Sequence, residues 1–147
     1  MPVVPTWDRA KTPEVDFVDL LGLEPGMTVA AIGAAAGSLH SSIAEVIGNT
    51  GQVHRISAVS PSPLHNDSCD RVVAMNLTSP ELGDPLTALH EAKRLLRGDG
   101  RLIVIEWGSD GRGRAFREMV RLLEFNTWSI HRHLADGPYH YLLEAAV

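Results

Sequence analysis

The stretch GMTVAAIGAAAG, from Gly26 to Gly37, decides the fold of this chain. Residues 29–32 form a short run of small apolar side chains, which is typical of a parallel strand covered by helices on both faces. Gly33 then allows a tight turn, and Gly37 allows the next helix to pack close to the strand. Because only alanines lie between these two glycines, the loop leaves space for a ligand at the carboxyl end of the strand.

The composition predicts one globular domain over residues 1–147, since 44% of the residues are hydrophobic and 21% are charged. The net charge of -5 argues against a nucleic-acid partner, because phosphate binding depends on clustered Lys and Arg. The single cysteine, Cys69, excludes an internal disulfide. No apolar run predicts a signal peptide or a membrane partner, and we expect a cytoplasmic protein.

The rest of the chain alternates between helical and strand patterns. Residues 1–13 contain three prolines and predict an irregular arm. Helices are predicted over residues 14–21, 38–47, 84–96 and 115–124, and strands over 29–32, 52–59, 71–77, 101–107, 127–134 and 139–146. Residues 97–100 are interpreted as the turn that ends the third helix, and the last two strands as an antiparallel hairpin. The segment 60–70 is too short and too rich in proline for the crossover helix and third strand that a full doubly wound fold has at this point.

This order of elements, together with GMTVAAIGAAAG and DPLTALHEAKRLLRGDGRLIVIEWG (residues 84–108), resembles the class I S-adenosylmethionine-dependent methyltransferases. The resemblance extends from about Glu14 to Val147. It implies an α/β, Rossmann-like fold with a mostly parallel sheet and a C-terminal antiparallel hairpin, here without the third-strand region. It also implies S-adenosylmethionine as the cofactor. The cofactor-binding candidates that it indicates are Gly33, Ala35, Gly37, Ser38, Ser57 and Asn76.

Several positions depart from the cofactor motifs of that family. Ala31 stands where the family has an acid, and Ala35 replaces the middle glycine of the loop. At the end of the second strand, where the family has an acid that accepts the ribose hydroxyls, the chain offers Ser57 or Ala58. Each lost charge-assisted hydrogen bond costs roughly 1.5 to 3 kcal/mol, so together the losses predict a much weaker site. We therefore predict a degenerate, non-catalytic domain that binds a partner or a small ligand, with an active small-molecule methyltransferase as the alternative.

Two residues are candidates for a general base in the crevice, if the chain is an enzyme. Glu106 ends a predicted strand, and His40 lies near the start of a predicted helix. The simpler interpretations are a solvent-facing carboxylate for Glu106 and an ordinary helix residue for His40. Cys69 is expected in a polar loop, where the neighbouring Asp67 and Asp70 would raise its pKa and make it a poor nucleophile.

The C-terminal hairpin suggests a second alternative function, a metal-binding module. His131 and His133 alternate along one predicted strand, so both would point to the same face, and His140 on the next strand could face them. Three imidazoles at this spacing could hold zinc. An exposed polar hairpin explains the same pattern without a metal.

The missing third-strand region also predicts an interaction surface. Without that region, the strand at residues 52–59 would form the edge of the sheet. Natural proteins rarely leave such an edge bare, because its free backbone groups can pair with another chain. The sequence thus predicts a protein partner or a homo-oligomer that uses this edge.

Overall fold

The computed structural model describes residues 21–33, 40–56, 61–77, 83–106, 112–135 and 141–147, and within these ranges it leaves out the side chains of residues 112–115 and 134–135. The described helices are α2 (His40–Ile47), α3 (Pro85–Leu95) and α4 (Arg112–Phe125). The described strands are β1 (Thr28–Gly33), β2 (Gln52–Ile56), β3 (Cys69–Met75), β4 (Leu96–Glu106), β5 (Ser129–Ala135) and β6 (Tyr141–Ala146). The predicted arm and the predicted helix over residues 14–21 lie almost entirely outside the described residues.

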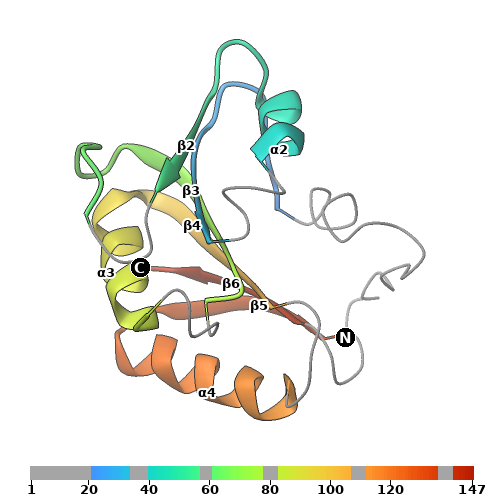
Figure 1. The fold of residues 1–147 in the computed structure, drawn as a ribbon, viewed down its shortest axis with the longest axis vertical. Helices are drawn as coiled ribbons and strands as arrows, with labels where there is room; N and C mark the ends of the chain where they lie inside the picture. The colour runs from blue at the N-terminus through green and yellow to red at the C-terminus, as the bar shows by residue number, and fades with distance from the viewer. Residues whose placement is uncertain (1–20, 34–39, 57–60, 78–82, 107–111, 136–140) are drawn as a thin grey trace.

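The described strands form one sheet in the order β2-β1-β3-β4-β6-β5 (Figure 1). The strands from β2 to β4 pair in parallel, whereas β6 pairs antiparallel with both β4 and β5. This confirms the predicted mixed α/β sheet with a C-terminal antiparallel pair. In the described part of the chain no strand lies beyond β2, as the short segment between β2 and β3 predicted.

Each face of the sheet carries its own apolar cluster, because successive strand residues point to opposite sides. Helix α2 covers one face, and α3 and α4 cover the other (Figure 1). The cluster on the α2 face contains Leu21, Val29, Ala31, Ile43, Ile47, Val73, Met75, Ile103, Ile105 and Leu142. The larger cluster on the other face includes Ala30, Ile32, Val72, Ala74, Leu89, Leu95, Leu102, Val104, Met119, Leu123 and Leu143. The two clusters hold the central strands, and so the strand ends, in place.

Helix α3 begins where the sequence predicted. The side chain of Asp84 accepts a hydrogen bond from the backbone N–H of Leu86 (2.9 Å), and Pro85 occupies the first turn. The prediction for its other end was wrong, because residues 97–100 are not a separate turn. The chain becomes extended at Leu96, which pairs with Cys69, and the β3–β4 register shifts between Cys69 and Arg71. That irregularity allows the glycine-containing segment to join the strand.

Cys69 opens β3 and is fully buried, so its predicted place in a polar loop was wrong. Polar neighbours in the sequence concealed an inward-facing position at the start of a strand. Burial raises the pKa of the Cys69 thiol, and the nearby Asp70 carboxylate adds to this effect. The direction of the predicted shift is confirmed, although burial is its main cause.

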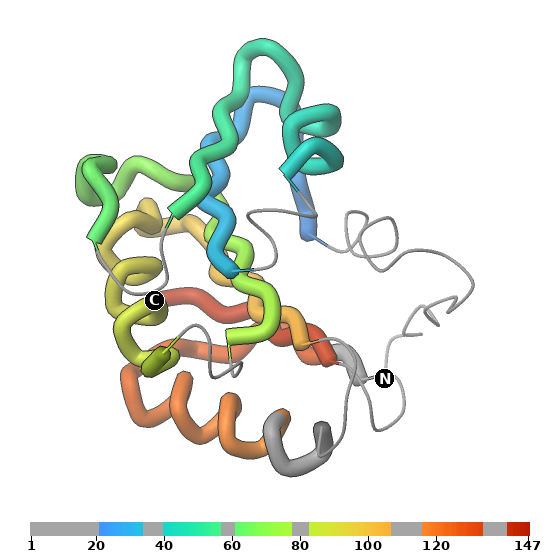
Figure 2. The backbone as a smooth tube through the Cα atoms, viewed as in Figure 1, coloured from blue at the N-terminus to red at the C-terminus, as the bar shows by residue number. Residues whose placement is uncertain are grey.

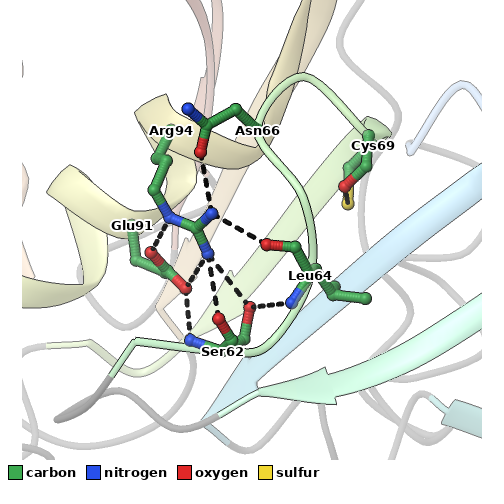
Figure 3. A network of polar contacts seen from close by, with 7 residues as sticks. Ser62, Leu64, Asn66, Cys69, Glu91 and Arg94 are labelled. Carbon is green, nitrogen blue, oxygen red and sulfur yellow. Dashed lines mark hydrogen bonds and ion pairs between the residues drawn. The ribbon is translucent and has the colours of Figure 1, made fainter.

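A polar network holds the short connection between β2 and β3 against α3 (Figure 3). The guanidinium of Arg94 donates to the backbone oxygens of Leu64 (2.8 Å) and Ser62 (3.1 Å) and to Oδ1 of Asn66 (2.9 Å). It also forms an ion pair with Glu91, with Nε 2.7 Å from Oε1. Leu64 packs against the cluster on this face. The network therefore fixes a segment that stands where a complete fold has a crossover helix and another strand.

Glu91 is the anionic centre of this network and is 7% exposed. The hydrogen bonds from Arg94, aided by the N–H of Ser62 at 2.5 Å from Oε2, lower the pKa of Glu91 to about 2. Burial alone would favour the neutral carboxyl, so the hydrogen bonds outweigh it. The ionised carboxylate is thus part of the fold.

Candidate functional site

The carboxyl ends of β1, β3 and β4 meet at one edge of the sheet, where open α/β sheets bind their ligands. Gly33 pairs with Met75, and Met75 pairs with Ile105, so the three strands end side by side. Asn76, which follows β3, donates its backbone N–H to the carbonyl oxygen of Ile105 (2.7 Å). Glu106 is the last residue of β4.

Two residues at this edge have left-handed backbones. Gly33 has φ of 70°, which glycine adopts without steric cost and which turns the chain sharply at the end of β1. Asn76 has φ of 59°, a conformation that asparagine tolerates better than most residues. The chain therefore turns abruptly at the ends of β1 and β3. The glycine loop in the sequence predicted the turn at the end of β1.

Of the six predicted cofactor-binding residues, the structure places Gly33 and Asn76 on neighbouring strand ends. The other four, which are Ala35, Gly37, Ser38 and Ser57, lie outside the described residues. Their participation stays a prediction.

Ala31 is fully buried on the α2 face of the sheet, in the same apolar cluster as Ile43 and Ile47. It occupies the position at which the resembled family has an acid. A carboxylate could not be placed in this apolar environment without a large desolvation cost. The described part of β1 hence offers no anionic group to a ligand.

Glu106 is 1% exposed, so the interpretation as a solvent-facing carboxylate was wrong. It pairs with Tyr141 across the β4–β6 ladder, and the Tyr141 ring meets Phe116 of α4 edge-on, with centroids 5.3 Å apart. The sequence contained a signal for this burial. Glu106 follows Leu102 and Val104 at a spacing of two, and both of those side chains lie in the core under α3 and α4.

A buried carboxylate beside the ligand edge can accept a hydrogen bond or a proton from a bound molecule. Its role as a general base stays a prediction. The other candidate base, His40, is the first residue of α2 and is half-buried.

The predicted three-histidine metal site is described only in part. His131 and His133 are exposed on β5, and His140 lies outside the described residues. The β5–β6 register shifts between Ile130 and Arg132, so simple alternation fails at His131. The described residues contain no group of three potential metal ligands. Because His140 lies outside the described residues, the three-histidine site stays a prediction.

No protein-family model and no curated protein matches the sequence. Solved structures match over nearly the whole chain. A SAM-dependent methyltransferase from Aquifex aeolicus is 22% identical, with a TM-score of 0.74 and coverage of 90% of this chain and 88% of that one. A TehB-like SAM-dependent methyltransferase from Corynebacterium glutamicum is 14% identical (TM-score 0.64, coverage 90% and 86%). Aeropyrum pernix fibrillarin with natively bound S-adenosyl-L-methionine is also 14% identical (TM-score 0.62, coverage 90% and 74%).

The chain thus has the fold of the SAM-dependent methyltransferases, as the sequence predicted. At these identities the likeness concerns the fold and not the chemistry of the site. Among the described helices, none is long and apolar enough to cross a membrane.

Proposed function

We propose that this protein is a methyltransferase-fold binding protein whose S-adenosylmethionine site has degenerated. In this proposal the edge of the sheet at the ends of β1, β3 and β4 takes a small ligand weakly or serves a protein partner, and the protein does not transfer methyl groups. The fold makes S-adenosylmethionine a plausible ligand, and when bound it would supply an electrophilic methyl group.

The burial of Ala31 is the observation that carries the proposal. Its methyl group is enclosed on the α2 face, so the strand that leads into the glycine loop brings no carboxylate to the crevice. The sequence after β2, Ser57 to Ser60, contains no acid either. Two charge-assisted hydrogen bonds of about 1.5 to 3 kcal/mol each are then missing from the ribose and amino-acid ends of the cofactor, which together would weaken binding by roughly 100-fold or more.

The connection after β2 supports the same conclusion. In the described part of the chain the sheet ends at β2, and Arg94 ties residues 62–66 to α3. A loop after a further strand, which would form a wall for the adenine ring, therefore has no counterpart in the described sheet. Each missing contact lowers affinity independently, so their combined loss weakens the site more than any one substitution.

Thermal unfolding with S-adenosylhomocysteine and S-adenosylmethionine tests this proposal. A ligand that binds only the native state raises the melting temperature by mass action, in proportion to the logarithm of its concentration over its Kd. We expect no shift beyond experimental error with either ligand at 1 mM, a concentration chosen for the test. A shift of several degrees that grows with ligand concentration would contradict the proposal.

An active small-molecule methyltransferase is the second candidate, and two observations favour it. Gly33 keeps the left-handed turn that lets a backbone approach a ligand closely. The Aquifex aeolicus protein matches this chain over similar shares of both sequences, so a protein described as a SAM-dependent methyltransferase has a comparably small fold. In this case Gly33 and Asn76 would hold the cofactor, and Glu106 would accept a proton from the methyl acceptor.

A further inference from the structure

The outer edge of β2 is the most regular backbone surface that the described chain leaves without a strand neighbour. Among the described strands, β2 pairs with β1 alone. The two run side by side through five consecutive residue pairs, from Thr28 and Gln52 to Ile32 and Ile56, without a register shift (Figure 2). A regular edge of this kind presents a row of N–H and C=O groups that can pair with another strand.

The hydrogen bonds to β1 show which groups face outward. The N–H of Gln52 donates to the carbonyl oxygen of Met27 (3.1 Å). In a parallel pair, every second residue directs both of its backbone groups to the same neighbour. Gln52, His54 and Ile56 thus bond to β1. Val53 and Arg55 direct their N–H and C=O groups away from the sheet.

The opposite edge, β5, is less suited to pairing. Its register shifts between Ile130 and Arg132, and a bulge of this kind disrupts the regular ladder and increases the local twist. The side chain of Arg132 is also held by Glu144, with Nη2 2.9 Å from Oε1. Edge strands with bulges and charges are protected from adding a further strand. Of the two edge strands, β2 is therefore the one that can accept a further strand.

We propose that the outer edge of β2 pairs antiparallel with β2 of a second copy of this chain, about a two-fold axis at His54. In this arrangement Val53 of each copy exchanges backbone hydrogen bonds with Arg55 of the other. The two His54 residues then lie directly opposite each other as a non-hydrogen-bonded pair. The two sheets join into one continuous sheet.

The residues of β2 favour this occupant and this register. A two-fold axis at His54 pairs all five residues of β2 with each other and places the apolar Val53 opposite the stem of Arg55, which is exposed. An axis at Arg55 would set two guanidinium groups face to face, and like charges directly opposite each other destabilise a strand pair. With an axis at Val53, two residues of β2 would instead lie opposite residues of the turn that precedes β2 in the second copy. Two-fold, self-complementary interfaces are also the commonest kind in homo-oligomers.

Cysteine cross-linking tests the register directly. Opposed residues in a non-hydrogen-bonded pair have Cα atoms about 4.5 Å apart, which is within the range that a disulfide spans. Under mild oxidation at pH 8 we expect the His54→Cys variant to form a covalent dimer in most of its chains. Gln52→Cys is the matched control, because it lies on the same face of β2 but four residues from its counterpart across the axis. Native Cys69 is fully buried, so we expect it not to cross-link in either variant.

Light scattering tests the dimer without a disulfide. We expect the native protein to be a dimer at micromolar concentration at pH 8. Arg55→Pro removes an outward N–H and no bond to β1, so it should yield a monomer with an unchanged circular dichroism spectrum. A monomeric native protein would overturn the proposal, as would equal cross-linking of the two cysteine variants. Neither result depends on whether the protein binds S-adenosylmethionine.

Discussion

The connection between β2 and β3 and the carboxyl end of β1 use charge in opposite ways. In the connection, the carboxylate of Glu91 and the guanidinium of Arg94 bind each other and the backbone of Ser62 and Leu64. At the end of β1, the position expected to carry an acid is Ala31, enclosed in the core. The comparison teaches that a carboxylate in this chain stabilises the shortened fold, whereas β1, as the structure describes it, brings none to the ligand edge.

The largest expected loss of stability follows from disrupting the network of Glu91 and Arg94. Arg94→Ala leaves Glu91, which is 7% exposed, without its cation, and removes the donors to the backbone of Ser62 and Leu64. Loss of one partner of a buried ion pair costs about 3 kcal/mol, which we expect in the free energy of unfolding measured with urea.

Arg97→Ala is the matched control for this variant. Its guanidinium is 49% exposed and lies 2.9 Å from Oδ1 of Asp70. Exposed ion pairs contribute less than about 1 kcal/mol, so the control should lose little stability. Equal losses in the two variants would show that the network is an ordinary surface feature.

A smaller effect should follow from pH. Because the pKa of Glu91 is lowered from 4.5 to about 2 in the folded protein, its stabilising effect is complete above pH 4.5 and disappears as the pH falls towards 2. Between pH 5 and pH 3 we therefore expect the free energy of unfolding of the native protein to fall by about 2 kcal/mol more than that of the Glu91→Gln variant. Urea unfolding of the native protein and of the Glu91→Gln variant across this pH range measures the difference in their free energies of unfolding. A constant difference between them would mean that Glu91 is not held ionised by the network.

Adding a carboxylate at the ligand edge tests whether a missing acid weakens cofactor binding. Ser57→Asp places a carboxylate after β2, where ribose hydroxyls would lie in a functional cofactor site. A charge-assisted hydrogen bond of about 1.5 kcal/mol should tighten binding of S-adenosylhomocysteine by about tenfold. Ser57→Asn, of similar size but neutral, is the control in a fluorescence or calorimetric titration. If both variants bind like the native protein, the missing acid is not what weakens this site.

The smallest effect should come from the turn at the end of β1. Gly33→Ala places a Cβ on a residue with φ of 70°, which costs about 1 kcal/mol in unfolding free energy. Gly98→Ala is the control, because a Cβ there meets nothing within 4 Å. Thermal unfolding of both variants measures the difference. If Gly33→Ala is as stable as Gly98→Ala, the turn does not require glycine.

The fold could be predicted from local patterns, because the order of strands and helices follows from apolar periodicity and from turn residues such as Gly33 and Gly48. That no described strand lies beyond β2 was also predictable, since segment 60–70 is too short to form one. Apart from the predicted turn at residues 97–100, the errors concerned side chains whose environment depends on distant residues. Cys69 has polar neighbours in sequence but faces the core, and Glu106 is covered because Tyr141, more than thirty residues later, pairs with it.

The network of Arg94 could not be predicted for the same reason. Its partners Ser62 and Leu64 come from a loop about thirty residues earlier, and no local pattern connects them to α3. At the candidate site, Gly33 and Asn76 could be named from the ends of their strands. The other four cofactor-binding candidates could be named only from the resemblance, and they lie outside the described residues.

Isothermal titration calorimetry of the native protein with S-adenosylhomocysteine tests the central claim most directly. A crevice without the two acids should give no measurable heat of binding at ligand concentrations below about 1 mM, where the free energy of binding would be weaker than about −4 kcal/mol. A Kd in the low micromolar range, corresponding to about −8 kcal/mol, would contradict the claim and establish a functional cofactor site.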